Sequence, residues 1–275
     1  MPSHEAKISP MDRGFLFGDG IYEVIPTYEG NIVGLHLHLE RMRNGLAEIG
    51  IQYHIDTEQW IKRIRRLISE SATPAQSVYI HISRGTDAKR FHAYPDNLEP
   101  TVYAFAFPIP DSQNMHSEEI RSYHVVTSED KRWQRCHIKS TSLLGNVMHY
   151  QHGKDNGKDE VILYNGKGQL TEASSCNVFV VKDGLISTPP LDHQILPGVT
   201  RQIVINAIRE QRKYDVQERI IHKSELDTAD EVWITSSSKE VGPVLSIDDK
   251  TVGTGVPGQV WRDTQQAYNE LKFRS

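Results

Sequence analysis

The most diagnostic segment of this chain is His137-Ile138-Lys139-Ser140-Thr141-Ser142-Leu143-Leu144-Gly145-Asn146, and Thr171-Glu172-Ala173-Ser174-Ser175-Cys176-Asn177 accompanies it. Lys139 lies where an alternating pattern predicts the end of a strand and a second pattern predicts the start of a helix. Glu172 follows a glycine-rich turn and falls between two predicted strands. Ile138, Leu143 and Leu144 are apolar, so we expect the stem of Lys139 to enter the protein. A partly buried lysine can attack a carbonyl carbon and form a Schiff base.

The composition is that of a globular protein, with 275 residues, 37% hydrophobic and 24% charged. This length suits two compact lobes better than one small core. The net charge of −5 argues against a nucleic-acid-binding protein, which needs a basic face. Cys136 and Cys176 are the only cysteines, which favours a reducing compartment. With no signal-peptide pattern and no run of about 20 apolar residues, we expect a cytoplasmic protein that does not enter a membrane.

Hydrophobic periodicity predicts two lobes joined by a linker. The first lobe is expected to have strands at residues 20–25, 32–34, 78–83 and 101–107 and helices at 37–49 and 60–68. The second is expected to have strands at residues 121–126, 161–164, 177–181, 185–188 and 231–235 and helices at 142–154 and 199–212. Prolines and polar residues predict the linker at 109–114, between a small α/β domain (1–108) and a larger domain (115–275) that carries Lys139. Short turns in the larger domain predict a sheet that curls into a pseudo-barrel, so the fold class is mixed α/β.

Three motifs along the chain point to one family. The lysine segment resembles the motif Lys-Ser-Leu-Asn-Leu-Leu-Gly, and the glutamate segment resembles Thr-Glu-Gly/Ala-Ser-Ser-x-Asn-Val/Phe-Phe. The third motif is Met11-Asp12-Arg13-Gly14-Phe15-Leu16-Phe17-Gly18-Asp19-Gly20-Ile21-Tyr22-Glu23. Over nearly its whole length the chain resembles the fold-type IV pyridoxal-phosphate enzymes, and most of all the D-amino-acid aminotransferases. The resemblance implies a two-domain fold, pyridoxal 5′-phosphate as cofactor and a homodimer with shared active sites.

The resemblance assigns the catalytic roles to Lys139 and Glu172. Lys139 would hold the cofactor and shuttle the Cα proton. Glu172 would keep the pyridine nitrogen protonated, so that the ring accepts electrons, and Arg132 matches an arginine that supports this acid. The other cofactor-binding residues that the resemblance implies are Arg41, Ser174, Ser175, Asn177, Leu196, Gly198, Val199, Thr200, Ser236 and Ser237. Of these, Gly198-Val199-Thr200 opens a predicted helix, whose first amides can bind a phosphate.

The resemblance also implies substrate-binding residues. These are Tyr22, Arg90, His92, Ser238 and Lys239. The loop with Arg90 and His92 resembles the carboxylate trap of the D-amino-acid enzymes, in which it reaches the neighbouring subunit's site. Between Thr86 and His92 this loop is one residue longer than the family's, and a basic surface loop is the alternative interpretation. Ser238 and Lys239 match a tight turn whose amides can meet an anion. The histidines offer no third ligand at useful spacing, so no metal site is predicted.

The predicted function is transfer of an amino group from a D-amino acid, such as D-alanine or D-glutamate, to pyruvate or 2-oxoglutarate. A branched-chain L-aminotransferase would show a tyrosine five residues after the lysine, where this chain has Leu144. An (R)-amine transaminase and an aminodeoxychorismate lyase stay open, because pocket loops rather than scaffolds decide the substrate. A non-catalytic binding protein on the same fold would have lost Lys139 or Glu172, and both are present.

Overall fold

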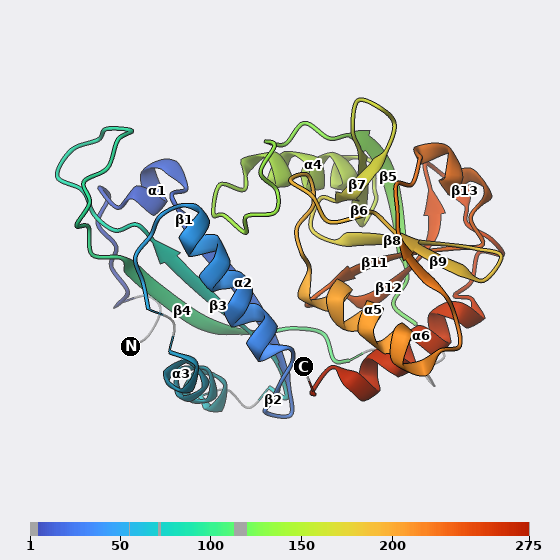
Figure 1. The fold of residues 1–275 in the computed structure, drawn as a ribbon, viewed down its shortest axis with the longest axis horizontal. Coiled ribbons are helices and arrows are strands. Elements are labelled where there is room, and N and C mark those ends of the chain that lie inside the picture. The colour runs from blue at the N-terminus through green and yellow to red at the C-terminus, as the bar shows by residue number, and fades with distance from the viewer. Residues whose placement is uncertain (1–4, 55, 71–72, 113–119, 275) are drawn as a thin grey trace. The chain divides into compact units, whose positions relative to one another are not determined.

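The computed structural model describes residues 5–54, 56–70, 73–112 and 120–274, and its contacts divide the chain into two compact units. The first unit comprises Met1–Asp111 with Ile138–Leu143, and the second comprises Ser112–His137 with Leu144–Ser275. Figure 1 shows the elements along the chain. The linker at 109–114 stays a prediction, because residues 113 and 114 lie outside the described residues.

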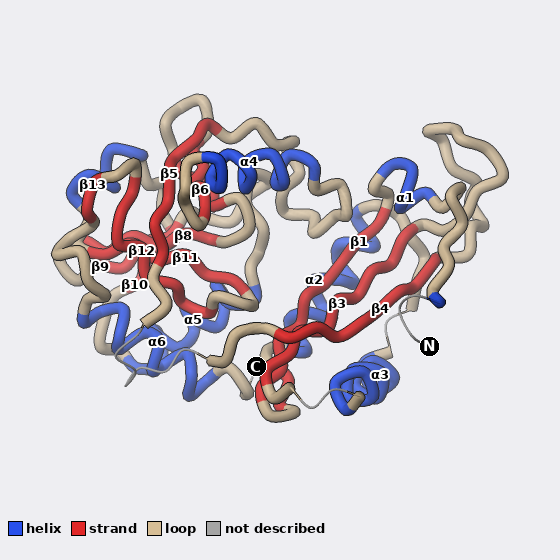
Figure 2. The backbone as a smooth tube through the Cα atoms, turned by 180° about the vertical axis from the view of Figure 1, so that it is seen from behind, coloured by secondary structure: helices blue, strands red, loops and turns tan. Residues whose placement is uncertain are grey.

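The first unit is built on an antiparallel sheet of four strands in the order β2-β1-β3-β4. Its strands are β1 (Gly20–Tyr28), β2 (Asn31–Ile32), β3 (Ala75–Ser83) and β4 (Thr101–Pro108). Its helices are α1 (Arg13–Phe17), α2 (Leu35–Glu48) and α3 (Thr57–Ser69). Figure 1 shows α2 lying across one face of this sheet, and Figure 2, seen from behind, shows the strands in front of α2.

The core of the first unit follows from helical and strand periodicity. Helix α2 buries residues spaced four, three and four positions apart, which places them on one face. They are Leu35, Leu39, Met42 and Leu46. Helix α3 buries Trp60, Ile64 and Ile68 in the same way and begins at Asp56, whose side chain accepts a hydrogen bond from the amide of Gln59. Together with apolar residues of β1 and β3 they form one hydrophobic cluster.

The second unit is built on a sheet of nine strands in the order β10-β9-β8-β11-β12-β5-β6-β7, with β13 paired to β12. Its strands are β5 (Tyr123–Glu129), β6 (Glu160–Tyr164), β7 (Leu170–Ala173), β8 (Asn177–Lys182), β9 (Leu185–Thr188), β10 (Val216–Glu218), β11 (Glu231–Ser236), β12 (Glu240–Ile247) and β13 (Lys250–Thr251). Its helices are α4 (Leu144–Asp155), α5 (Val199–Gln211), the 3₁₀ helix η2 (Lys223–Thr228) and α6 (Gln259–Leu271).

The large sheet mixes parallel and antiparallel pairs. Strands β9 and β10, β12 and β5, and β5 and β6 run parallel, whereas the other neighbours run antiparallel. A hydrophobic cluster on this sheet includes Val125, Ile162, Val178 and Val232. Helices α5 and α6 pack against each other and against the sheet. Among the described residues, no helix has the length and apolar character needed to cross a membrane.

The predicted mixed α/β fold class is confirmed, and every helix and strand predicted from periodicity occurs at its predicted place. Bounds differ by a few residues. For example, the helix predicted at 37–49 is α2. The sequence analysis did not predict α1, β7, β10, β12, β13, η2 or α6. Glu172 therefore lies on a strand, β7, and not between two strands, because the polar Thr171 and Glu172 hid a strand whose residues are all buried.

The prediction that Lys139 lies at a strand end is wrong. Residues 130–143 form a loop, and α4 begins only at Leu144. The apolar residues alternate in this segment because Cys136 and Ile138 are buried. Their backbone, however, does not join a strand of the large sheet. The amide of Cys136 donates to the carbonyl oxygen of His193 at 2.7 Å. The contacts of residues 138–143 group them with the first unit rather than with the second.

Candidate active site

Lys139 is anchored to strand β1 through its backbone. Its carbonyl oxygen accepts a hydrogen bond of 3.1 Å from the amide of Tyr22, and Ser140 pairs with Ile21 in an antiparallel bridge. Ile138 is part of the core of the first unit. The Nζ atom lies 4.1 Å from the centre of the Tyr22 ring, within the range of a cation–π contact. The structure therefore brings Lys139 and Tyr22 together.

Tyr22 belongs to a row of aromatic side chains on strands β1, β3 and β4. Its ring stacks on that of Tyr79 with 5.8 Å between centres, and Tyr79 meets Phe105 at 5.2 Å. The Tyr79 hydroxyl lies 3.0 Å from Nδ1 of His81. Burial raises the pKa of Tyr79 to about 12, so this hydroxyl is neutral at physiological pH. The row supports the ring on which the amine of Lys139 rests.

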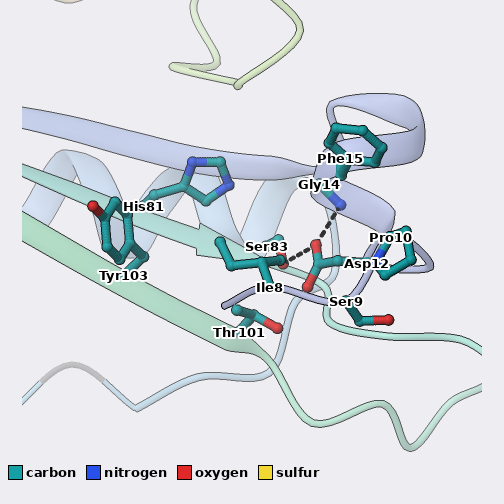
Figure 3. A pocket seen from close by; sticks show the side chains of 10 residues that line it. All are labelled: Ile8, Ser9, Pro10, Asp12, Gly14, Phe15, His81, Ser83, Thr101 and Tyr103. Carbon is teal, nitrogen blue, oxygen red and sulfur yellow. Dashed lines mark hydrogen bonds between the residues drawn. The ribbon is translucent and has the colours of Figure 1, made fainter. Parts of the chain in front are cut away.

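A cavity of about 460 Å³ lies in the first unit and is lined by residues 8–15, β3 and β4. Figure 3 shows Asp12 in its wall, accepting hydrogen bonds from the amide of Gly14 at 2.8 Å and the hydroxyl of Ser83 at 2.7 Å. The other carboxylate oxygen of Asp12 is buried and has no hydrogen-bond partner among the described residues. The lining includes no residue that the sequence analysis assigned to the reaction, so we leave this cavity out of the candidate site.

Arg41, on α2, is held by a buried carboxylate that the sequence analysis did not include. Its Nε and Nη2 atoms donate to the two carboxylate oxygens of Glu23 at 2.8 and 2.7 Å. Nδ1 of His38 lies 2.7 Å from Glu23 as well. Burial acts to raise the pKa of Glu23, but Arg41 and His38 together outweigh it and lower that pKa to about 2. Arg41 is therefore a cation held in a fixed orientation.

We expect Glu23→Gln to destabilise the protein most at neutral pH. The carboxylate contributes stability above its ordinary pKa of 4.5, and this contribution is lost as the pH falls toward the folded value of about 2. A shift of this size corresponds to about 3 kcal/mol. Urea unfolding should therefore show a gap between wild type and variant that narrows from about pH 7 to about pH 3. Glu40→Gln, on the exposed face of α2, is the matched control. A gap that stays constant with pH would contradict this account.

Arg90 and His92 lie in the loop after β3, and their side chains are exposed. Both contact Phe17, whose ring centre is 5.3 Å from the Arg90 guanidinium and 5.6 Å from the His92 ring. Arg13 holds the loop by donating to two of its carbonyl oxygens at 2.7 and 2.9 Å. Arg90 and His92 thus share a contact with Phe17. Tyr22, the other predicted member of the trap, contacts Lys139 and Tyr79.

Glu172, on β7 of the second unit, is a buried carboxylate in a hydrogen-bond network. Its Oε1 accepts from Nη1 of Arg132 at 2.5 Å, and its Oε2 accepts from the amide of Leu196 at 3.0 Å and from Nδ2 of Asn177 at 3.2 Å. Burial raises the pKa of Glu172 to about 7, although Arg132 opposes the shift. The structure brings these four residues together, and the part of Leu196 that contacts Glu172 is its backbone amide.

Arg132 is held in turn by Asp130. Its Nε and Nη2 atoms donate to the two carboxylate oxygens of Asp130 at 3.0 and 2.7 Å, and the hydroxyl of Thr171 donates to the same carboxylate at 2.9 Å. Burial acts to raise the pKa of Asp130, but the hydrogen bond and charge of Arg132 outweigh it, so the pKa is lowered. The guanidinium thus joins an ionised aspartate to Glu172 in a nearly buried network.

Glu160, the first residue of β6, gathers three of the predicted site residues. The hydroxyls of Ser174 and Ser175 donate to its two oxygens, and Nζ of Lys239 lies 3.7 Å from it. Glu160 is fully buried, whereas the side chain of Lys239 is 15% exposed. Glu160 therefore orients the two serine hydroxyls, and the amine of Lys239 lies at the edge of the same cluster.

The start of α5 has backbone amides that are suited to bind an anion. Its N-cap is Gly198, which makes no side-chain cap hydrogen bond, so the first amides of the helix, at Val199 and Thr200, meet no capping side chain there. A methyl group at Gly198 would come within 1.9 Å of Oδ1 of Asn177. Glycine at this position therefore allows the helix start to approach Asn177, which is itself bonded to Glu172.

The second candidate phosphate segment is the turn between β11 and β12. It carries Ser236, Ser237, Ser238 and Lys239, and the amide of Lys239 donates to Oγ of Ser236 at 3.2 Å. This turn and the start of α5 both belong to the second unit, together with Glu172. Arg41, the remaining predicted phosphate ligand, belongs to the first unit.

Residues 20–247 match the protein family described as Amino-transferase class IV. This chain is a class IV aminotransferase. The enzyme is 38% identical over 267 residues to the D-alanine aminotransferase of Bacillus licheniformis, with 97% of this chain and 92% of that protein covered. It is 37% identical over 268 residues to the D-alanine aminotransferase of Staphylococcus epidermidis, with 97% and 93% covered. The predicted family and the predicted transaminase activity are confirmed.

Solved structures of the same fold include other aminotransferases. The branched-chain amino acid aminotransferase of Escherichia coli has a TM-score of 0.90 and 23% identity, covering 99% of this chain and 91% of that chain. An aminotransferase of Mycobacterium tuberculosis, solved in its PLP-bound form, has a TM-score of 0.84 and 18% identity, covering 99% and 95%. At these identities the likeness concerns the fold alone, and it confirms the predicted fold class.

The predicted cofactor, pyridoxal 5′-phosphate, is that of this enzyme class, and the residues of the second unit fit it. Glu172 is a buried carboxyl whose pKa is raised by burial, and the positive charge of a protonated ring nitrogen beside it would favour its ionised form. The glycine-capped start of α5 suits a phosphate. Among the described residues, no group of three His, Cys, Asp or Glu side chains could hold a metal ion.

The sequence analysis missed Glu23, His38, Asp130 and Glu160. A signal for Glu23 was present, because it lies two residues from both Ile21 and Ile25 and therefore shares the buried face of β1 with them. A buried carboxylate requires partners. Glu160 directly precedes an apolar run in the same way. Neither position reveals which cation or hydroxyl will pair with the carboxylate. In both cases the partner comes from another element.

Proposed function

We propose that this enzyme transfers the amino group of a D-amino acid, such as D-alanine or D-glutamate, to pyruvate or 2-oxoglutarate. The observation that carries the proposal is the identity of 38% and 37% to two D-alanine aminotransferases, each over 97% of this chain. Leu144 supports it, because the sequence pattern of the branched-chain enzymes would place a tyrosine there.

In this proposal Lys139 and Glu172 carry the chemistry. Bound pyridoxal 5′-phosphate supplies an aldehyde carbon and a ring that accepts electrons from Cα of the amino acid. Nζ of Lys139 would hold the cofactor between turnovers and would move the Cα proton of the donor. Glu172 would hold the proton on the ring nitrogen, and Arg132 orients that carboxyl group and favours its ionised form. The overall reaction exchanges the amino group of the donor amino acid for the carbonyl oxygen of the acceptor keto acid.

The other assigned residues bind and orient. Arg41, Ser236, Ser237 and the helix start at Gly198, Val199 and Thr200 are assigned to the phosphate. The ring is assigned to Ser174, Ser175, Asn177 and Leu196. Two features support the phosphate assignment: Glu23 fixes the guanidinium of Arg41, and α5 has no side-chain cap. A planar guanidinium and a row of amides are both strong partners for an anion.

The substrate carboxylate is assigned to Tyr22, Arg90, His92, Ser238 and Lys239, in a homodimer with shared sites. Arg90 and His92 are exposed on a loop that Arg13 stabilises, and this supports a role for them in the site of a second copy. Sedimentation or light scattering should then report a dimer. The cytoplasmic location stays a prediction.

A donor panel tests the proposed function. The enzyme loaded with pyridoxal 5′-phosphate is given D-alanine, D-glutamate, L-leucine or an (R)-amine, each with 2-oxoglutarate as acceptor. We expect kcat/KM for the D-amino acids to exceed that for L-leucine by at least about a hundredfold, because a site shaped for one enantiomer misplaces the Cα proton of the other.

The alternatives give other results. Faster turnover of L-leucine would identify a branched-chain enzyme, and faster turnover of the (R)-amine an amine transaminase. Pyruvate release from aminodeoxychorismate without an acceptor would identify the lyase. A protein that binds no cofactor and stays colourless would contradict every catalytic assignment.

A further inference from the structure

The turn that carries the proposed phosphate serines ends in an unusual backbone. Glu240, the residue after Lys239, has a φ of 54°, in the left-handed region that glycine adopts readily and other residues avoid. It pairs with Ser236 across the hairpin of β11 and β12 and closes the turn at residues 237–239. Its conformation therefore sets where the serines of the turn lie, and something must hold it there.

The side chain of Glu240 is fully buried and anchored by a network. Its oxygens accept from Nζ of Lys272 at 2.6 Å, from Nε2 of Gln265 at 3.2 Å, and from Oγ of Ser112 at 3.0 and 3.1 Å. The Lys272 ammonium also donates to Ser112 at 2.6 Å and to Oδ1 of Asn269 at 3.0 Å. Each of its three protons thus has an acceptor, which is what a buried ammonium requires.

Helix α6 holds the backbone of the hairpin as well. Oε1 of Gln265 accepts from the amide of Val241 at 3.2 Å, and Nε1 of Trp261 donates to the carbonyl oxygen of Val241 at 2.7 Å. Trp261, Gln265 and Asn269 are spaced four residues apart, so they share one face of the helix. This face and Lys272, just beyond the helix end, fix both the side chain of Glu240 and the backbone of the next residue.

A buried ion pair is a poor way to gain stability, because desolvation offsets most of the attraction between the charges. Lys272 and Glu240 are 3% and 0% exposed and take no part in the chemistry assigned above. An apolar pair at these positions would pack the helix but would lack the hydrogen bonds that hold residue 240 in its left-handed conformation. The pair is better explained by the geometry that it imposes on the turn.

We propose that Lys272 and Gln265 are positioning residues, which act through Glu240 to hold the turn of Ser236 and Ser237 in the geometry that binds the cofactor phosphate. This inference rests on the proposed assignment of those serines. It adds the C-terminal helix to the residues on which cofactor affinity depends, although α6 itself supplies no ligand.

The test compares two ligands that differ only in the phosphate. Enzyme stripped of cofactor is titrated with pyridoxal 5′-phosphate and with pyridoxal, and the absorbance of the lysine-bound form is followed. For Lys272→Met and Gln265→Met we expect the Kd for pyridoxal 5′-phosphate to rise by at least about tenfold. The Kd for pyridoxal should change by less than about twofold, because pyridoxal has no phosphate to lose.

Lys213→Met is the matched control, because it removes a lysine that pairs with Asp263 on the exposed side of the same helix. It should leave both Kd values unchanged. Thermal unfolding of the stripped proteins separates loss of fold from loss of affinity. If Lys272→Met does not fold, Gln265→Met, which removes no charge, tests the positioning role by itself.

Folded variants with unchanged affinity for pyridoxal 5′-phosphate, or with equal losses for both ligands, would overturn the positioning role. A wild-type protein that binds neither ligand would instead refute the proposed function, so the two failures are distinguishable.

Discussion

Lys139→Ala is expected to lower transaminase turnover by at least about a thousandfold, because in the proposed function one side chain both holds the cofactor and moves the proton. The variant should also lose the visible absorbance of the lysine-bound cofactor. Its fold should survive, because the anchors of the segment are backbone bonds to β1, and the side-chain contact that is lost is a cation–π contact with Tyr22. That contact is worth about 0.5–2 kcal/mol.

Lys131→Ala is the control for this loss. Lys131 lies in the same loop, its side chain is 68% exposed, and it pairs with the exposed Glu129 at 2.7 Å. Its removal should leave turnover and absorbance unchanged. Borohydride reduction of the wild type, followed by peptide mass analysis, should place the pyridoxyl group on residue 139. Attachment at another lysine would refute the assignment.

Arg132→Met is expected to have the largest effect on stability. It removes the cation between Asp130 and Glu172, and all three side chains are at most 10% exposed. Taking one partner from a buried ion pair costs about 3–5 kcal/mol, because the remaining charges lose their compensation. Urea unfolding of the variant should show a loss of this order, with an unchanged dependence on denaturant concentration.

The same variant should change the pH dependence of turnover. Arg132 opposes the effect of burial on Glu172, whose pKa is about 7, so its loss raises that pKa further. A smaller fraction of Glu172 is then ionised at neutral pH, and the acidic limb of the pH–rate profile should move to higher pH. Arg135→Met, an exposed arginine three residues along, should change neither stability nor profile. An Arg132→Met protein as stable as the control would show that the network is dispensable.

Much of the fold was predictable because apolar periodicity records burial. Helix α3 shows this, since Trp60, Ile64 and Ile68 repeat at the spacing of one helical face and are all buried. The same signal failed at β7, where Thr171 and Glu172 are buried on a strand without being apolar. Apolar periodicity also wrongly predicted that a strand ends at Lys139. The residues before Lys139 are alternately buried, as in a strand, but they lie in a loop whose backbone hydrogen bonds go to other segments.

The sequence motifs predicted residues for the candidate site but not the acids that orient them. Sequence motifs identify Lys139, Glu172 and the serines of the β11–β12 turn. They do not identify four buried or nearly buried acids, each of which orients a predicted site residue or the turn that carries one. These acids are Glu23, Asp130, Glu160 and Glu240. An acid in a buried position signals that a partner exists, but the partner is chosen by packing.

The sequence by itself determined which reactive and binding groups are present: an amine at 139, a carboxyl at 172, hydroxyls and a glycine-capped helix start. It also determined the type of most helices and strands, through their apolar periodicity. The tertiary structure alone decided the ionic pairings, joining Arg132 to Glu172 across 40 positions and Lys272 to Glu240 across 32. The physical reason is that charge state and orientation depend on burial and on neighbours from other elements. Those neighbours are fixed only when the elements pack.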